Sequence, residues 1–145
     1  MEIKKILIIE DSQDDIELLK RAFQKTGQSL EISVAKDGAE AMDYIRYASE
    51  LSQTASSRFP DLILLDLKLP KVDGFQVLRF IRDDACFGLS PVIILSSSGE
   101  RKDINLAYEL GANSYLKKPI DFKYFINVIN VLTQYWLFMN EPPRI

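Results

Sequence analysis

A short apolar run that ends in an aspartate constrains the fold of this chain more than any other feature. Leu62 to Leu65 are consecutive aliphatic residues within the stretch Phe59-Pro-Asp-Leu-Ile-Leu-Leu-Asp-Leu-Lys-Leu-Pro70. The run is too short for a helix and is bounded by prolines, so it predicts a strand covered on both faces of a parallel sheet. Asp66 follows this strand directly. Because ligands and chemistry collect beyond the carboxyl ends of strands in open α/β sheets, Asp66 is placed to act.

Strand and helix patterns alternate five times along the chain. Apolar or alternating segments predict strands at 6–9, 30–34, 62–65, 91–95 and 114–117. Helical patterns follow each of them, the first capped by Ser12 with Asp15 three residues later, and the last spanning roughly 121–138. This alternation predicts an α/β fold, with a parallel sheet and helices on both faces. The polar, aperiodic segment 49–58 is interpreted as a surface loop that only connects.

Composition limits the classes of protein and of chemistry. A chain of 145 residues that is 47% hydrophobic fits one domain, and we expect it to span 1–138, with a flexible tail at 139–145. The net charge of -3, without a basic run, argues against direct nucleic-acid binding. A single cysteine and the lack of a secretory or membrane-spanning segment predict a cytoplasmic protein with no membrane association. The absence of histidine excludes histidine metal ligands and His-based catalysis within the chain.

Polar residues follow four of the predicted strands and should meet at one rim of the sheet. They are Glu10, Asp11, Asp66, Ser96 and Lys118. Crowded carboxylates repel, which raises their pKa values or recruits a cation, and hard oxygen ligands suit Mg²⁺. A lysine and a serine hydroxyl can offset the charge of a phosphoryl group. The set therefore matches what an aspartyl phosphate needs, with a carboxylate as nucleophile.

These motifs, in this order, resemble those of the receiver domains of two-component response regulators. The resemblance runs from Lys5 to about Leu132 and rests on these positions: Glu10-Asp11, Asp66 in its Pro-bounded strand, Asp73-Gly74, Ser96, Gly111-Ala112, Tyr115 and Lys118-Pro119. It implies a doubly wound, flavodoxin-like (βα)5 fold with five parallel strands in the order 2-1-3-4-5. It also implies a switch that receives phosphate from a histidine kinase and signals by contact. Such a protein catalyses only its own phosphorylation and dephosphorylation and is not a turnover enzyme.

The resemblance implies a role for each matching position. Asp66 would be the phosphoacceptor, and Ser96 and Lys118 would contact the phosphoryl group. Mg²⁺ would be held by Asp11, Asp66 and the backbone carbonyl of Lys68, with Glu10 acting mostly through water. Tyr115 would be the aromatic switch that turns inward as Ser96 moves, and the Lys118-Pro119 bond is a candidate for the cis form.

The sequence departs from the family pattern at three positions, and it also has a more specific resemblance within the family. Glu10 stands where Asp is commoner, and Ser96 replaces the more frequent Thr, which loosens χ1 and its coupling to Tyr115. Lys68 adds a cation at the pocket mouth and should affect the phosphoryl lifetime. The polar segment before Phe59 and the Tyr-Trp-Leu end resemble the stand-alone regulators that partner cyanobacterial and bacterial phytochromes, which implies a phytochrome kinase as donor.

The predicted last helix carries two apolar stripes. One stripe is long enough to cover the sheet and comprises Phe122, Phe125, Ile129, Leu132 and Trp136. The other lies beside it and comprises Tyr124, Val128, Val131, Tyr135 and Phe138. Together they exceed the roughly 100° that a surface helix buries against its own core. The surplus predicts a symmetric homodimer through this helix, because large apolar patches rarely face water.

Other classes of function remain open on this scaffold. A docking module that works without phosphorylation is the main alternative, although the presence of Asp66, Asp11 and Lys118 argues against it. A phosphohydrolase with an aspartyl nucleophile generally needs an acid where Lys68 stands. A flavin protein would need a phosphate cradle after Ile9, and the loop there is not rich in Gly, Ser or Thr.

Overall fold

The fold is a single five-stranded parallel sheet with helices on both faces, as predicted. The structure is a computed structural model and describes residues 3–52, 59–118 and 121–143. The elements in chain order are β1 (Lys4–Ile9), α1 (Gln13–Gln24), β2 (Leu30–Ala35), α2 (Gly38–Ser52), β3 (Leu62–Leu65), α3 (Gly74–Asp83), β4 (Val92–Ser96), α4 (Arg101–Glu109), β5 (Ser114–Lys117), α5 (Phe122–Leu132) and a π-helix, η1 (Thr133–Met139).

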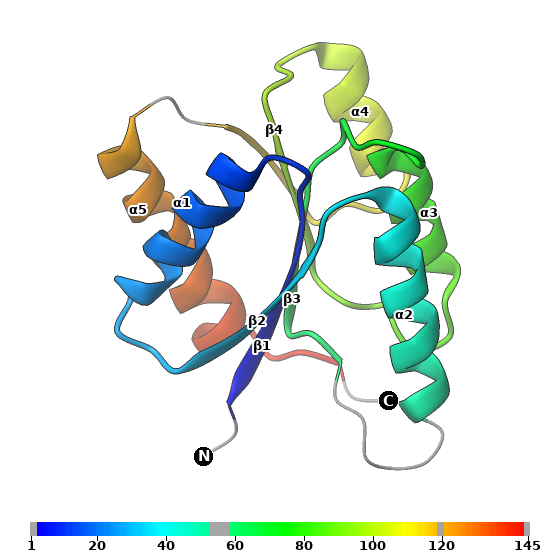
Figure 1. Ribbon diagram of the computed structural model, residues 1–145, viewed down its shortest axis with the longest axis horizontal. Helices are drawn as coiled ribbons and strands as arrows, with labels where there is room; N and C mark the ends of the chain where they lie inside the picture. The colour runs from blue at the N-terminus through cyan, green and yellow to red at the C-terminus, as the bar shows by residue number, and fades with distance from the viewer. Residues whose placement is uncertain (1–2, 53–58, 119–120, 144–145) are drawn as a thin grey trace.

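The sheet order β2-β1-β3-β4-β5 confirms the expected doubly wound topology. Helices α1 and α5 cover one face, and α2, α3 and α4 cover the other (Figure 1). The central strands β1 and β3 are fully buried where they pair, with Ile9 beside Leu65 at their carboxyl ends. The chain leaves β1 and β3 toward opposite edges of the sheet, so the strand order reverses between them. In such sheets this reversal point is where ligands bind.

Helix α2 is longer than the sequence indicated. The segment 49–58 was predicted to be a loop, but residues 49–52 continue the helix, and 53–58 lie outside the described residues. The Ser49 hydroxyl donates a hydrogen bond of 2.9 Å to Asp84 Oδ1, just beyond α3. This contact ties the end of α2 to the segment that follows α3.

The predicted last helix is correct in extent but changes its geometry after Leu132. From Thr133 the chain forms a π-helix, and the buried Thr133 hydroxyl donates to the Ile129 carbonyl at 2.8 Å. The wider turn places Leu137 in the core, at 3% exposure, whereas Trp136, which was predicted to cover the sheet, is only half-buried. A hydroxyl that bonds back into the helix and a wide turn are local features that apolar spacing alone does not reveal.

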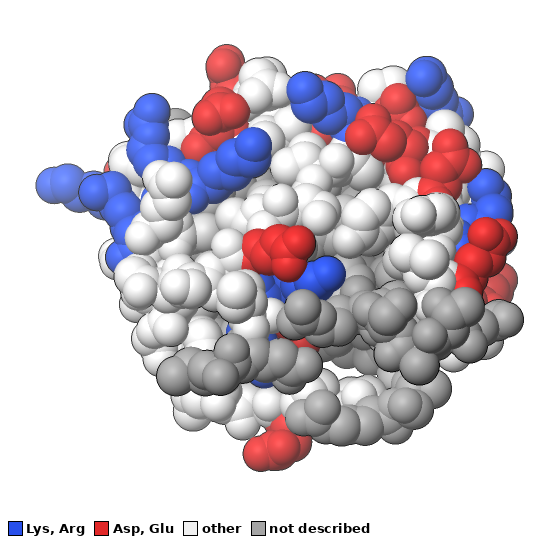
Figure 2. Space-filling model, turned by 60° about the horizontal axis from the view of Figure 1, so that its bottom comes forward, with Lys and Arg blue, Asp and Glu red and all other residues white. Residues whose placement is uncertain are grey.

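Charged residues do not form a continuous basic surface on the face shown in Figure 2. This view turns the lower end of Figure 1 forward, where β1 begins; basic side chains gather toward the left, acidic and basic ones mix toward the right, and one of each sign lies near the centre. Within the described residues, no helix combines the length and the apolar character needed to cross a membrane.

Candidate functional site

Backbone hydrogen bonds align the carboxyl ends of the strands and so bring the predicted residues together. The N–H of Glu10 donates to Ala35 O at 3.0 Å, and the N–H of Asp66 donates to Ile9 O at 3.0 Å. The N–H of Lys118 donates to Ser96 O at 2.7 Å. Each bond extends a strand pairing by one residue, so the side chains that follow β1, β3 and β5 share one rim.

Three carboxylates converge at this rim, as the sequence predicted. Glu10, Asp11 and Asp66 each offer an oxygen, and these oxygens lie within 4.8 Å of one another. Glu10 and Asp66 are buried, whereas Asp11 is exposed and leaves one side of the cluster open to solvent. Such a set of hard oxygen donors with access to water fits a divalent cation of the Mg²⁺ type.

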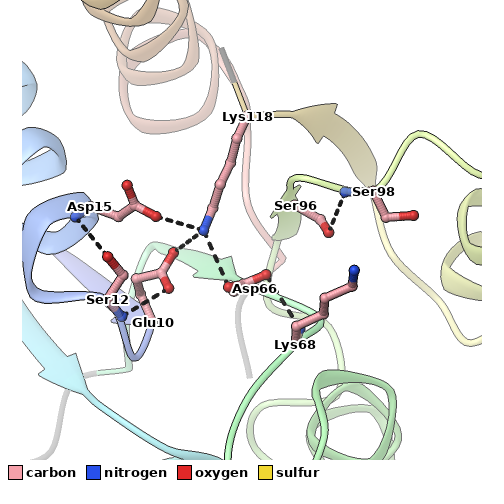
Figure 3. A network of polar contacts seen from close by, with 8 residues as sticks. All are labelled: Glu10, Ser12, Asp15, Asp66, Lys68, Ser96, Ser98 and Lys118. Atoms are coloured by element: carbon pink, nitrogen blue, oxygen red, sulfur yellow. Dashed lines mark hydrogen bonds and ion pairs between the residues drawn. The ribbon is translucent and has the colours of Figure 1, made fainter. Parts of the chain in front are cut away.

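Lys118 is the cation at the centre of the site (Figure 3). Its Nζ lies 2.6 Å from Glu10 Oε1, 2.8 Å from Asp15 Oδ2 and 3.2 Å from Asp66 Oδ2. An ammonium group has three donors, and here each has a carboxylate. The lysine therefore offsets the repulsion that the acids would otherwise suffer in a poorly hydrated corner.

Burial and neighbouring charges shift the pKa values of Glu10 and Lys118. Burial raises the pKa of Glu10 to about 7, helped by the charge of Asp66 and opposed by the hydrogen bond from Lys118. Burial alone would lower the pKa of Lys118, but hydrogen bonds to Asp15 and Glu10 outweigh it and raise that pKa above its usual value. Lys118 is thus charged at neutral pH, and Glu10 exchanges a proton near neutrality.

The loop between β3 and α3 supports Asp66 from the other side. The N–H of Lys68 donates to Asp66 Oδ1 at 3.3 Å, and the Lys68 side chain is exposed. Gly74 begins α3 directly against this loop, and its N–H donates to Leu67 O at 2.8 Å. Asp73 caps α3 in a reciprocal capping box with Gln76, which fixes where the helix starts.

Ser96 lies fully buried at the end of β4 and links to the loop that leads into α4. Its Oγ accepts a hydrogen bond from the N–H of Ser98 at 3.2 Å. The Ser98 hydroxyl donates to Asp103 Oδ2 at 2.6 Å, and the Tyr115 hydroxyl donates to Ser98 O at 2.7 Å. Ser96 and Tyr115, which the sequence singled out, are therefore connected through Ser98.

Sequence reasoning missed the roles of Asp15 and Ser98. Asp15 was assigned to helix capping alone, and Ser98 was treated as a loop residue. The signal for Asp15 was its position in the first turn after the acid pair, which directs its carboxylate back toward the strand ends. The predicted cis bond at Lys118-Pro119 involves a residue outside the described part of the chain.

Comparison with known proteins places the chain in a family. The model of the response regulator receiver domain matches residues 6–130. The probable methanogenesis regulatory protein FilR2 of Methanothrix harundinacea is 36% identical over 95% of this chain and 86% of that protein. The response regulator Rcp1 of Synechocystis is 34% identical over 92% of this chain and 89% of that protein.

Solved structures agree with this assignment. The phosphorylated cyanobacterial phytochrome response regulator RcpA has a TM-score of 0.87 and 35% identity, over 99% of this chain and 100% of that one. The Mn(2+)-bound form of Rcp1 has a TM-score of 0.84 and 33% identity, over 97% and 99%. With a family match over most of its length, and with the acids, serine and lysine at the carboxyl ends of the strands, the chain belongs to the response regulator receiver family.

Proposed function

We propose that this receiver takes a phosphoryl group onto Asp66. The observation that carries the proposal is the position of the Asp66 carboxylate: buried, in contact with the Lys118 ammonium, and within the cluster of three acids. A carboxylate beside a fixed ammonium group is arranged to accept a dianionic group whose charge would otherwise be repelled. A docking module that works without phosphate has no use for such a buried arrangement of charges.

In the transfer, one Asp66 carboxylate oxygen attacks the phosphorus of a phosphohistidine on the donor kinase. The P–O bond forms as the P–N bond breaks, and the imidazole leaves with the electron pair. Dephosphorylation is a hydrolysis: water attacks phosphorus, the Asp66–phosphate bond breaks, and inorganic phosphate leaves. The chain thus catalyses only its own phosphorylation and dephosphorylation.

Several residues around Asp66 would together neutralise the negative charge of the transferred phosphoryl group. The Lys118 ammonium and the Ser96 hydroxyl would contact phosphoryl oxygens. Mg²⁺ would be held by Asp11, Asp66 and the Lys68 carbonyl, with Glu10 acting through water, and it supplies neutralisation of the developing negative charge. Movement of Ser96 toward the phosphoryl group would pull on Ser98, whose carbonyl holds the Tyr115 hydroxyl. Tyr115 is thereby the switch residue.

The donor is a histidine kinase in the cytoplasm, and we propose that it is of the phytochrome class. Support comes from the similarity to RcpA, a cyanobacterial phytochrome response regulator, over 99% of this chain. Efficient transfer from a purified phytochrome kinase is expected, at a rate at least tenfold above transfer from an unrelated kinase. Equal transfer from both would remove the phytochrome assignment and leave the phosphoacceptor assignment in place.

The direct test is to incubate the protein with acetyl phosphate and Mg²⁺ and to record its intact mass. A gain of one phosphate is expected, and Asp66→Asn should abolish it, because an amide is not a nucleophile toward phosphorus. Circular dichroism of the variant controls for folding. A phosphate gain that survives Asp66→Asn would remove Asp66 from its role, and no gain in the wild type with either acetyl phosphate or a kinase would favour the docking module.

We also propose that the chain forms a homodimer through α5 and η1. The predicted second stripe is largely exposed: Tyr124 at 59%, Val131 at 64%, Tyr135 at 48% and Phe138 at 47%, with Val128 half-buried. Of these four exposed apolar side chains, two lie on α5 and two on η1, and a twofold axis through this part of the molecule would bury each of them twice.

Val131→Glu should weaken this dimer at least about tenfold, because the symmetry places two new carboxylates in one interface. Asn130→Glu is the matched control, since Asn130 is exposed on the same helix but points away from the stripe. Sedimentation of the phosphorylated and unphosphorylated protein measures both. A monomeric wild type at high micromolar concentration in both states would contradict the proposal.

A further inference from the structure

Asp15 stands apart from the other partners of the Lys118 ammonium. It extends from the first turn of α1, whereas Glu10 and Asp66 follow strands of the sheet (Figure 3). Its Oδ2 lies 2.8 Å from Lys118 Nζ, closer than the Asp66 oxygen at 3.2 Å. Asp15 therefore shares the cation on which the proposed phosphoryl site depends.

The placement of Asp15 is built into the turn that precedes it. The Ser12 Oγ accepts from the N–H of Asp15 at 3.3 Å, so the helix cap fixes the Asp15 backbone. In a complete capping box the Asp15 carboxylate would accept the N–H of Ser12. Here that N–H donates to Glu10 Oε2 at 3.2 Å instead. The Asp15 carboxylate is thus directed at Lys118, and Ser12 positions two partners of the ammonium at once.

The three carboxylates differ in the free-energy cost of losing contact with the Lys118 ammonium. The Glu10 and Asp66 side chains are 3% and 8% exposed, so either would be left as a buried, poorly hydrated charge. The Asp15 side chain is 35% exposed and can exchange the ammonium for water at low cost. Of the three contacts, the one with Asp15 is the easiest to give up.

A phosphoryl group on Asp66 needs a donor from Lys118, whose three donors are already committed. We propose that Asp15 is a positioning residue that holds the Lys118 ammonium before phosphorylation and competes with the phosphoryl group for it afterwards. The inference rests on the proposed phosphoacceptor role of Asp66. Because the competitor is an anion, its contact favours the unphosphorylated state and weakens the binding of a phosphoryl group at Asp66.

The test compares Asp15→Asn with Asp14→Asn, which makes the same charge change in the same helical turn at an exposed position. Beryllofluoride with Mg²⁺ serves as the probe of the phosphoryl-bound state, and its affinity is measured by fluorine NMR. Asp15→Asn should bind the probe roughly fivefold more tightly than the wild type, the size expected from a partly exposed ion pair. Asp14→Asn should bind the probe as the wild type does.

A second measurement reports on the contact without any phosphoryl probe. Hydrogen exchange of the Lys118 ammonium, followed by nitrogen NMR in the metal-free protein, should accelerate severalfold in Asp15→Asn and stay unchanged in Asp14→Asn. Equal probe affinities in all three proteins, or equal gains in both variants, would overturn the role of Asp15. If the wild type binds no beryllofluoride, the proposed function itself fails, and the ammonium exchange still decides whether Asp15 holds Lys118.

Discussion

Gly74→Ala is expected to lower the free energy of unfolding by about 3 kcal/mol and to displace the loop that carries Asp66 between β3 and α3. A Cβ at position 74 would overlap the carbonyl oxygen of Asp66 and would lie 2.5 Å from the Cα of Leu67. Both neighbours are backbone atoms at the end of a buried strand, so neither can rotate away as a side chain would. Either α3 withdraws from the sheet or the chain after β3 shifts, and Asp66 moves with it.

Gly99→Ala is the matched control for this substitution. The atoms nearest to its Cβ would be those at the end of the Lys117 side chain, with Nζ at 3.4 Å, and this flexible end can move at little cost. Urea unfolding followed by circular dichroism should place Gly99→Ala within about 0.5 kcal/mol of the wild type. Gly74→Ala should also accept phosphate from acetyl phosphate more slowly. If Gly74→Ala unfolds at the same urea concentration as the wild type, the close approach of α3 to the loop does not contribute to stability as argued.

The strands of this fold could be predicted from the sequence because burial on both faces leaves a strong signal. The run Leu62–Leu65 admits few alternatives, and the confirmed sheet order follows from the family resemblance. The errors lie where side-chain hydrogen bonds, one between distant residues and one within a helix, accompany a backbone geometry that apolar spacing does not indicate. Ser49 is held in α2 by Asp84, which is 35 residues away, and Thr133 opens a π-turn through a bond to Ile129. Neither partner can be identified from the spacing of apolar residues.

The convergence of the acids at the strand ends was predictable for a similar reason. Parallel strands bring their carboxyl ends together, so Glu10, Asp11 and Asp66 needed only the correct strands to meet. Asp15 could not be placed in this way, because it reaches Lys118 from a helix, and its direction depends on where the Ser12 N–H donates. The roles of the gathered side chains in phosphoryl transfer stay predictions.

Glu10 should make the metal-free protein less stable as the pH rises from about 5 to 7.5. Burial raises the pKa of Glu10 from 4.5 to about 7, so between these values the folded protein binds a proton that the unfolded chain has released. The stabilisation is complete below pH 4.5 and is lost as the pH passes through about 7, with a total of up to about 3 kcal/mol from this group. The cause is desolvation, which the Lys118 ion pair offsets only in part.

Glu10→Gln isolates this contribution, because the amide is uncharged and its carbonyl can still accept from Lys118. The variant should match the wild type below about pH 4.5 and exceed it by up to about 3 kcal/mol at pH 8, where the wild type carries the buried charge. Addition of Mg²⁺ at pH 8 should recover much of this loss in the wild type, since the cation binds the deprotonated acids, and should recover less near pH 5. Urea unfolding across this pH range, with and without Mg²⁺, measures all of these differences. Parallel pH profiles for Glu10→Gln and the wild type would show that Glu10 does not titrate in this window, and that the ammonium of Lys118 fully offsets its burial.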